Sequence, residues 1–125
     1  MDENELSKII VDCFYQIHKK LGPGLFESVY EEVLCYELSR NNLACERQVE
    51  IPVIYETVSM GIGFKADVIV AKKVIIELKS IENILPIHKK QLLTYLRLSG
   101  IKLGLLVNFN SEFVKDGIVR IVNVL

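Results

Sequence analysis

Two short runs of β-branched residues, separated by only three residues, constrain the fold of this chain more than any other part of it. Residues 66–70 and 74–78 each have the length of one strand, and 71–73 is short enough for a hairpin turn. If the residues that flank this turn pair with each other, Asp67 lies directly opposite Glu77, with Cβ atoms about 5 Å apart. A turn one residue longer or shorter would place the two carboxylates on opposite faces of the sheet.

The charged residues in these apolar strands need a physical reason, because a buried charge is costly unless it is paired or bound to a metal. Glu77 and Lys79 are two residues apart and project from one face of their strand, while Leu78 projects from the other. Two facing carboxylates repel each other, and a divalent cation would remove the repulsion by taking both as ligands. Mg²⁺ commonly takes one or two carboxylates and fills its shell with water and phosphate oxygens.

This arrangement predicts a chemistry as well as a ligand. With Mg²⁺ or Mn²⁺ held by Asp67 and Glu77, Lys79 would lie beside an attacking water molecule whose pKa the metal lowers. We therefore expect hydrolysis of a phosphodiester bond. The alternative is that the three side chains form a surface ion cluster, which would contribute little to stability.

The rest of the pattern predicts helices packed against a mixed sheet. Apolar residues at helical or alternating spacing, punctuated by Gly and Pro, predict helices over 6–21, 26–42 and 86–100 and strands over 48–55, 66–70, 74–78, 103–107 and 118–124. Pro52 marks an edge strand or a bend, and we expect Gly61-Ile62-Gly63 to be a bend. The element order ααβββαββ indicates one α/β domain over 1–125, with a mixed α+β sheet.

The composition of the chain argues against several classes of protein. No apolar run approaches the ~20 residues of a membrane span, and the acidic start Met-Asp-Glu-Asn-Glu does not resemble a signal peptide, so we expect a cytoplasmic protein. Three cysteines without CxxC spacing argue against a disulfide framework or a zinc site, and we interpret them as small core residues in a reducing compartment. GxSxG, P-loop and GxGxxG motifs are absent from the sequence.

Charge is unevenly distributed along the chain, although the net charge is only -1. Residues 1–64 carry five basic and eleven acidic side chains, whereas 65–125 carry ten basic and five acidic ones. A basic half could attract phosphate while the acidic half keeps the whole chain near neutral. The alternative is an ordinary mixed surface exposed to solvent.

Two motifs resemble a known family. Asp67 followed by Glu77-Leu78-Lys79 resembles the D…ExK core of the PD-(D/E)XK nuclease superfamily, and Gly24-Leu25-Phe26-Glu27-Ser28-Val29-Tyr30 resembles the signature of its GxxExxY branch. The segments 21–24 and 106–109 are also similar to that branch, so the resemblance covers about 9–122. It implies a restriction-endonuclease-like core.

The resemblance also implies roles for individual residues. Asp67 and Glu77 would be metal ligands with Lys79 close by, the backbone carbonyl of Leu78 would join the metal shell, and Glu27 would add a further carboxylate. A simpler explanation of Glu27 is that an acid near a helix N-terminus is favoured by the helix dipole.

The third predicted helix carries a further pattern. Gln91 and Tyr95 are neighbours on one helical face and are similar to the QxxxY motif of RecB-type exonucleases, in which the Gln lies near the active site. Tyr95 could equally be a core residue. For phosphate binding we consider basic side chains at this helix start and at the hairpin turn, namely His88, Lys89, Lys90, Lys72 and Lys73; His88 could also be an ordinary surface histidine.

Three functions are consistent with these observations. The first is a metal-dependent nuclease acting on DNA, or less readily on RNA. The second is a catalytically silent module that binds nucleic acid or protein, and the third is hydrolysis of another phosphodiester or nucleotide. Because 125 residues leave little room for a recognition domain, a homodimer or a protein partner could supply specificity.

Overall fold

A computed structural model describes residues 1–124 of the chain. Its elements follow the expected order ααβββαββ, with one short 3₁₀ helix added before the last strand. They are α1 (Glu3–Leu21), α2 (Glu27–Arg40), β1 (Cys45–Tyr55), β2 (Val58–Val70), β3 (Val74–Lys79), α3 (Pro86–Ser99), β4 (Leu103–Asn108), η1 (Val114–Gly117) and β5 (Ile118–Val122). The predicted fold class, a mixed sheet with helices packed against it, is confirmed.

The five strands form one sheet in the order β1-β2-β3-β4-β5. Among the strands of residues 1–124, only β3 and β4 pair in parallel, because α3 connects them as a crossover, and the other neighbours are antiparallel. β1 is therefore an edge strand, and the pairing register shifts at Pro52, which has no backbone N–H to donate. The predicted edge position of the strand that carries Pro52 is confirmed.

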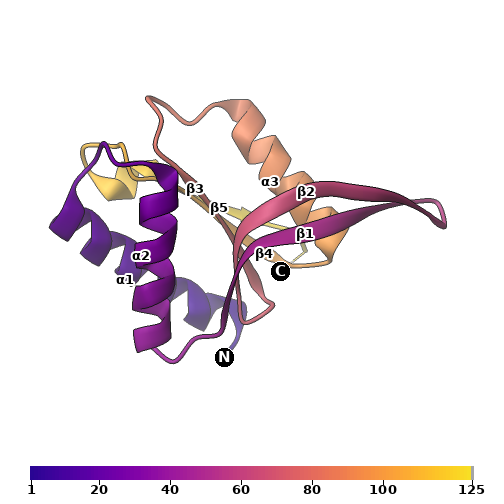
Figure 1. The fold of residues 1–125 in the computed structure, drawn as a ribbon, viewed down its shortest axis with the longest axis horizontal. Helices are drawn as coiled ribbons and strands as arrows, with labels where there is room; N and C mark the ends of the chain where they lie inside the picture. Colours follow the sequence, from indigo (N-terminus) through magenta and orange to yellow (C-terminus); the bar gives the residue numbers. More distant parts are fainter. Residues whose placement is uncertain (125) are drawn as a thin grey trace.

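β1 and β2 continue well beyond the rest of the sheet as a two-stranded arm (Figure 1). The sequence predicted only 66–70 as the second strand of this pair and a bend at Gly61-Ile62-Gly63. That expectation was wrong, since β2 begins at Val58 and these residues lie inside it. Gly61 has a φ of 93°, and a Cβ on Gly63 would lie 2.1 Å from Val53 Cγ2, so the arm needs glycine at both positions.

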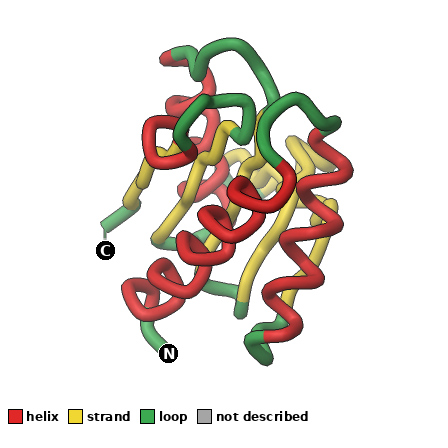
Figure 2. Tube along the Cα trace, turned by 90° about the vertical axis from the view of Figure 1, so that its left-hand side faces the viewer, coloured by secondary structure: helices red, strands yellow, loops and turns green. Residues whose placement is uncertain are grey.

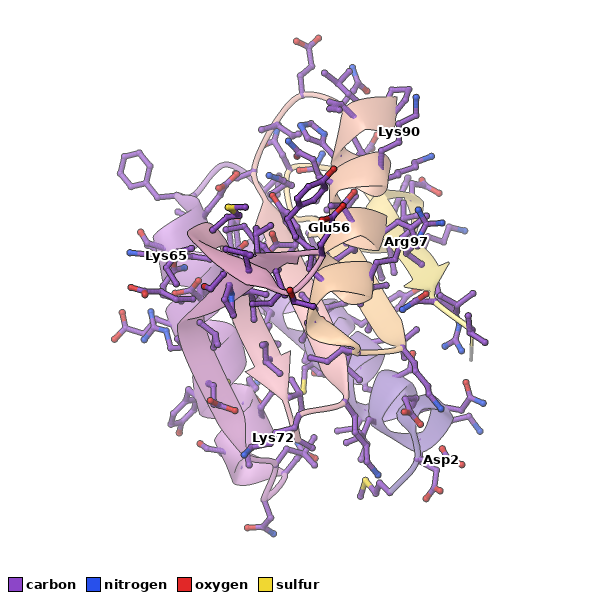
Figure 3. All side chains as sticks on the ribbon, turned by 90° about the vertical axis from the view of Figure 1, so that its right-hand side faces the viewer. Asp2, Glu56, Lys65, Lys72, Lys90 and Arg97 are labelled. Carbon is purple, nitrogen blue, oxygen red and sulfur yellow. The ribbon has the colours of Figure 1, made fainter. Side chains whose placement is uncertain are left out.

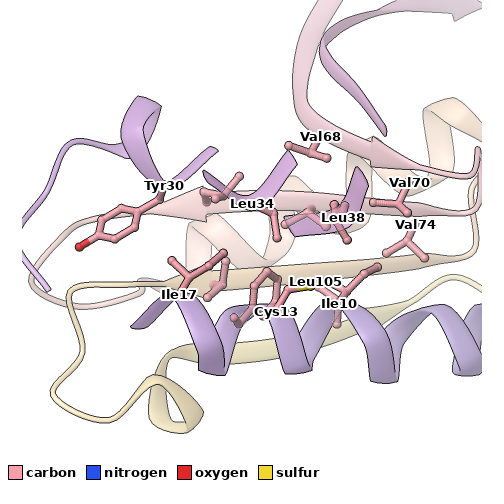
Figure 4. Packing of buried hydrophobic residues seen from close by; sticks show 14 of the residues in the cluster. Ile10, Cys13, Ile17, Tyr30, Leu34, Leu38, Val68, Val70, Val74 and Leu105 are labelled. Atoms are coloured by element: carbon pink, nitrogen blue, oxygen red, sulfur yellow. The ribbon is translucent and has the colours of Figure 1, made fainter. Parts of the chain in front are cut away.

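The helices cover opposite faces of the sheet. α1 and α2 pack side by side against one face (Figure 2), where even-numbered residues of β3 and odd-numbered residues of β4 point into a large apolar core. Figure 4 shows three residues from each helix, Ile10, Cys13 and Ile17 from α1 and Tyr30, Leu34 and Leu38 from α2, meeting the sheet in this core. α3 covers the other face through Leu92 and Leu96.

Local sequence explains the ends of the helices. The Asp2 side chain accepts a hydrogen bond from the Glu5 N–H at 2.8 Å and caps α1, which ends at Gly22 with a φ of 71°. α3 begins with Pro86 and ends at Gly100 in the left-handed conformation. Within residues 1–124, no helix combines the length and the apolar character that crossing a membrane would require.

Candidate active site

The β2–β3 hairpin brings Asp67 and Glu77 together. The pairing runs from Val70 opposite Val74 to Val68 opposite Ile76, which is the register predicted from a three-residue turn. One step further along, the Asp67 N–H donates to Glu77 Oε2 at 2.9 Å. The Leu78 N–H donates in return to Asp67 Oδ2 at 3.0 Å. Each carboxylate is thus held by the opposite strand through one of its two oxygens.

The environment of this acidic pair opposes its ionisation. Burial, followed by the charge of Asp67, raises the pKa of Glu77 from its ordinary 4.5 to about 8. Burial also raises the pKa of Asp67. Lys79 lowers the pKa of both carboxyl groups, but burial acts more strongly on each of them. The pair therefore holds a proton more readily than free carboxyl groups do.

The start of α2 faces Asp67 across a small pocket of about 220 Å³. This pocket is lined by Glu27, Ser28, Glu31, Gln48, Asp67 and Leu78. Glu27 Oε2 accepts a hydrogen bond from the Ser80 N–H at 3.0 Å, so α2 is linked to the chain directly after β3. The structure thus brings Glu27, Asp67 and Leu78 to one pocket.

Glu31 and Gln48 line this pocket although the sequence predicted no role for them. Glu31 is buried, and its carboxylate accepts from Arg47 at 2.9 and 3.1 Å and from Gln48 Nε2 at 2.7 Å. Gln48 Nε2 also lies 3.5 Å from Asp67 Oδ1, so this amide bridges α2 to the acidic pair. The only available signal was that Glu31 lies one helical turn after Glu27, beside buried positions of the same helix.

Tyr30 fixes the loop that precedes Glu27. Its ring is fully buried and stacks on Phe109 with centroids 4.4 Å apart. Its hydroxyl donates to the Gly22 carbonyl at 2.6 Å and accepts from the Leu25 N–H at 3.2 Å. Figure 4 shows this hydroxyl pointing out of the apolar core. The loop between α1 and α2 is therefore tied to the core through one phenol.

Hydrogen bonds fix each residue of the segment from Lys79 to Ile81. The Phe109 N–H donates to the Lys79 carbonyl at 3.0 Å, and Ser80 Oγ donates to the Leu25 carbonyl at 2.7 Å. The Asn108 amide accepts from the Ile81 N–H at 3.1 Å and donates to the Ile81 carbonyl at 2.9 Å. These bonds immobilise the backbone from which Lys79 projects.

α3 borders the acidic pair from the other face. Tyr95 stacks on Phe64 with ring centroids 3.7 Å apart, and burial together with the charges of Glu77 and Asp67 raises its pKa. Gln91 is exposed one turn earlier on the same helix. His88 Nδ1 accepts from the Leu85 N–H at 2.9 Å, so this ring nitrogen stabilises the start of α3.

The lysines considered for phosphate binding lie in two different places. Lys89 and Lys90 are exposed in the first turns of α3, and Lys89 also lines a second pocket of about 230 Å³ near Asn108. Lys72 and Lys73 lie at the β2–β3 turn, where Lys73 Nζ donates to the Met1 carbonyl at 2.6 Å. Figure 3 shows Lys72 and Lys90 at opposite ends of the molecule. The structure therefore does not bring Lys72 or Lys73 to the acidic pair.

The oxygen donors at this site suit a small divalent cation. Within residues 1–124, no three His, Cys, Asp or Glu side chains converge as they would in an all-protein metal site. Mg²⁺ and Mn²⁺ do not need such a cage, because water and phosphate oxygens can complete their shells. Two adjacent carboxylates with raised pKa values, each with a second oxygen free of the hairpin bonds, fit this requirement.

Comparison with known proteins identifies the family of the chain. A family model described as the PD-(D/E)XK nuclease superfamily matches residues 4–121, which is nearly the whole chain. No curated protein and no solved structure matches the chain.

Proposed function

Because the chain belongs to the PD-(D/E)XK nuclease superfamily, we propose that its acidic pocket holds Mg²⁺ or Mn²⁺ and hydrolyses phosphodiester bonds in nucleic acid, with DNA as the principal substrate. The observation that carries the proposal is the interlocked pair of Asp67 and Glu77, whose pKa values are both raised. We also propose that the chain belongs to the GxxExxY branch, whose Glu and Tyr correspond to Glu27 in the pocket and Tyr30 in the loop anchor.

Asp67 and Glu77 would hold the cation directly, and the Leu78 carbonyl would join its shell. Glu27 lines the same pocket as Asp67 but does not converge with the pair, so it would reach the cation through a water molecule. The bound cation supplies positive charge to the phosphate oxygens and makes a water molecule easier to deprotonate. The backbone bonds on Asp67 Oδ2 and Glu77 Oε2 keep both carboxylates fixed, so neither has to reorganise during the reaction.

Lys79 acts beside this pair. It follows Glu77 on the same face of β3, and its charge acts on both carboxylates. An ammonium group at this place donates hydrogen bonds to the attacking water and to a non-bridging phosphate oxygen as negative charge develops there. The bonds that hold the backbone from Lys79 to Ile81 fix the point from which this side chain projects.

Substrate contacts are proposed along α3. Gln91, Lys89 and Lys90 are exposed on its first turns, where the helix N-terminus favours a phosphate. Tyr95 is partly exposed beside the acidic pair and could contact the sugar or base next to the cleaved bond. Specificity beyond these contacts would come from a second copy of the chain or from a protein partner.

A cleavage assay with a matched lysine pair tests the proposal. Wild-type protein, Lys79→Ala and Lys72→Ala are incubated with Mg²⁺ or Mn²⁺ and with linear duplex, single-stranded and branched DNA and RNA. We expect metal-dependent cleavage by wild type, a loss of about 10²–10⁴-fold in Lys79→Ala, and wild-type rates in Lys72→Ala, because Lys72 lies at the far end of the strands. Equal cleavage by wild type and Lys79→Ala would refute the assignment.

A further inference from the structure

Two of the three cysteines lie in contact, although they are ten positions apart in the sequence. Cys35 is on α2, Cys45 is the first residue of β1, and their Sγ atoms are 2.7 Å apart. Both are free thiols and are partly exposed. A disulfide bond is about 2.05 Å long, so forming one here needs a sulfur movement of less than about 1 Å.

The surrounding structure holds the two sulfur atoms in this relation. Glu31, one helical turn before Cys35, pairs with Arg47, two residues after Cys45, at 2.9 Å. The Ala71 N–H donates to the Ala44 carbonyl at 2.8 Å, and this bond fixes the residue directly before Cys45. The approach of α2 to β1 is therefore set by bonds that do not involve sulfur.

The electrostatic environment gives the two thiols different roles. The hydrogen bond between them, assisted by the nearby Arg47 guanidinium, lowers the pKa of Cys45. The same hydrogen bond, followed by burial, raises the pKa of Cys35. The environment thus favours ionisation of Cys45 over ionisation of Cys35. Because a thiolate reacts with oxidants and a thiol does not, Cys45 should react first.

Cys13 provides an internal control. It is buried in the core between α1, α2 and the sheet, where burial raises its pKa to about 11. Its only hydrogen bond among the described residues is a long one of 3.8 Å from Asn41 Nδ2. Cys13 should therefore remain reduced under conditions that oxidise the pair.

We propose that Cys35 and Cys45 form a redox-modification site, a dithiol that peroxides convert into a disulfide linking α2 to β1. The Cys45 sulfur attacks one oxygen of hydrogen peroxide, the O–O bond breaks, and the hydroxide released takes a proton and leaves as water. Cys35 sulfur then attacks the resulting sulfenic acid, the S–O bond breaks, and a second water leaves. Two thiols lose two electrons in total, and one peroxide is reduced to two waters. A small-molecule dithiol reduces this disulfide to the two thiols by thiol–disulfide exchange and is itself oxidised to a disulfide.

The disulfide would close next to the candidate active site. Glu31 and Gln48, which line the pocket with Asp67, lie one helical turn before Cys35 and three residues after Cys45. Oxidation would therefore tie the start of β1 to α2 without using any residue proposed as a metal ligand. The site does not depend on the proposed nuclease activity, and it can be tested without measuring that activity.

Peptide mapping tests the proposal on the whole chain. Wild-type protein is treated with one equivalent of hydrogen peroxide, remaining thiols are alkylated in denaturant, and the chain is digested with trypsin. Cleavage after Lys20, Arg40 and Arg47 puts Cys35 in peptide 21–40 and Cys45 in peptide 41–47. We expect these two peptides joined by a disulfide, Cys13 fully alkylated, and loss of the crosslink on treatment with dithiothreitol. Full alkylation of all three cysteines, or crosslinks through Cys13, would overturn the proposal.

Single variants test the order of the two steps. In Cys35→Ser, Cys45 has no thiol partner, so peroxide should leave it as a sulfenic acid that a cyclic diketone probe labels. In Cys45→Ser, Cys35 should remain reduced and unlabelled. The melting temperature of oxidised wild type should exceed that of reduced wild type by several degrees, because the crosslink restricts the unfolded chain. Labelling of Cys35 rather than Cys45, or an oxidised protein that melts no higher than the reduced one, would contradict the account.

Discussion

At the scale of single residues, the fold strongly changes the pKa of Glu77. Its pKa rises from 4.5 to about 8 because it is buried beside Asp67. The folded chain therefore holds the Glu77 proton more tightly than the unfolded chain does. It follows that the contribution of Glu77 to stability is fully present below about pH 4.5 and is lost as the pH rises towards 8.

Glu77→Gln should remove this pH dependence, because a neutral amide keeps the shape of the side chain without the charge. In the presence of a chelator at pH 8, we expect the variant to unfold at a higher urea concentration than wild type. Its free energy of unfolding should be larger by on the order of 1–3 kcal/mol. At pH 5 the free energies of unfolding of the two proteins should differ much less. Urea titrations at pH 5, 6.5 and 8 measure the effect. An equal loss of stability in both proteins over this range would show that Glu77 is not the titrating group.

The acidic pair could be predicted from the sequence, whereas its neighbours could not. The three residues between the two strands fix the register, and the register places Asp67 beside Glu77. Gln48 lies opposite Asp67, between the pairs Arg47–Val68 and Val49–Ala66, and it has an irregular backbone with a φ of 50°. An irregularity of this kind depends on tertiary contacts and leaves no periodic signal in the sequence.

At the scale of elements, the α1–α2 loop depends on Tyr30 for its conformation. The Tyr30 hydroxyl binds Gly22 on one side and Leu25 on the other, and Ser80 then binds both Leu25 and Glu27. The loop, the start of α2 and the end of β3 thus form one connected hydrogen-bonded unit. A substitution at Tyr30 should consequently affect the position of Glu27.

Tyr30→Phe should cost about 1–3 kcal/mol of stability, because the Gly22 carbonyl and the Leu25 N–H lose their common partner. The stacking on Phe109 should survive, since the ring is unchanged. Tyr36→Phe is the matched control, because Tyr36 is 61% exposed. Urea unfolding of the two variants measures the difference. If Tyr30→Phe and Tyr36→Phe lower the free energy of unfolding equally, the hydroxyl of Tyr30 does not hold the loop.

The helices and the core of the sheet could be predicted because their apolar periodicity is strong. The β1–β2 arm could not be predicted. Residues 58–64 pair with β1, yet they contain two glycines and have mostly exposed side chains. Strand prediction relies on one buried face, and this segment has none at its outer end. Its strand structure comes from pairing with β1.

At the scale of the whole molecule, the sheet separates α1 and α2 from α3 and leaves the acidic pair between α2 and α3. The net charge of -1 limits the attraction of any nucleic acid to this site. The basic second half of the chain includes the lysines at the start of α3, so phosphate contacts should concentrate there.

Binding of duplex DNA should accordingly be weak and dependent on salt. With Lys79→Ala, used to prevent cleavage, we expect a dissociation constant above about 10⁻⁶ M at physiological salt and a loss of affinity between 50 and 200 mM salt. Fluorescence anisotropy at several salt concentrations measures both. Lys89→Ala should reduce the salt dependence, and Lys72→Ala should leave it unchanged. Affinity that does not vary with salt would indicate a surface made for a protein partner.

The central claim is that Asp67 and Glu77 together bind a divalent cation, and calorimetric titration of Mn²⁺ into wild type and Asp67→Asn tests it most directly. We expect wild type to bind Mn²⁺ with release of a proton and with an affinity that increases from pH 6 to pH 8, because Glu77 must ionise to bind the metal. Asp67→Asn should remain folded and bind at least about tenfold more weakly. Binding of Mn²⁺ by Asp67→Asn as tightly as by wild type would contradict the account.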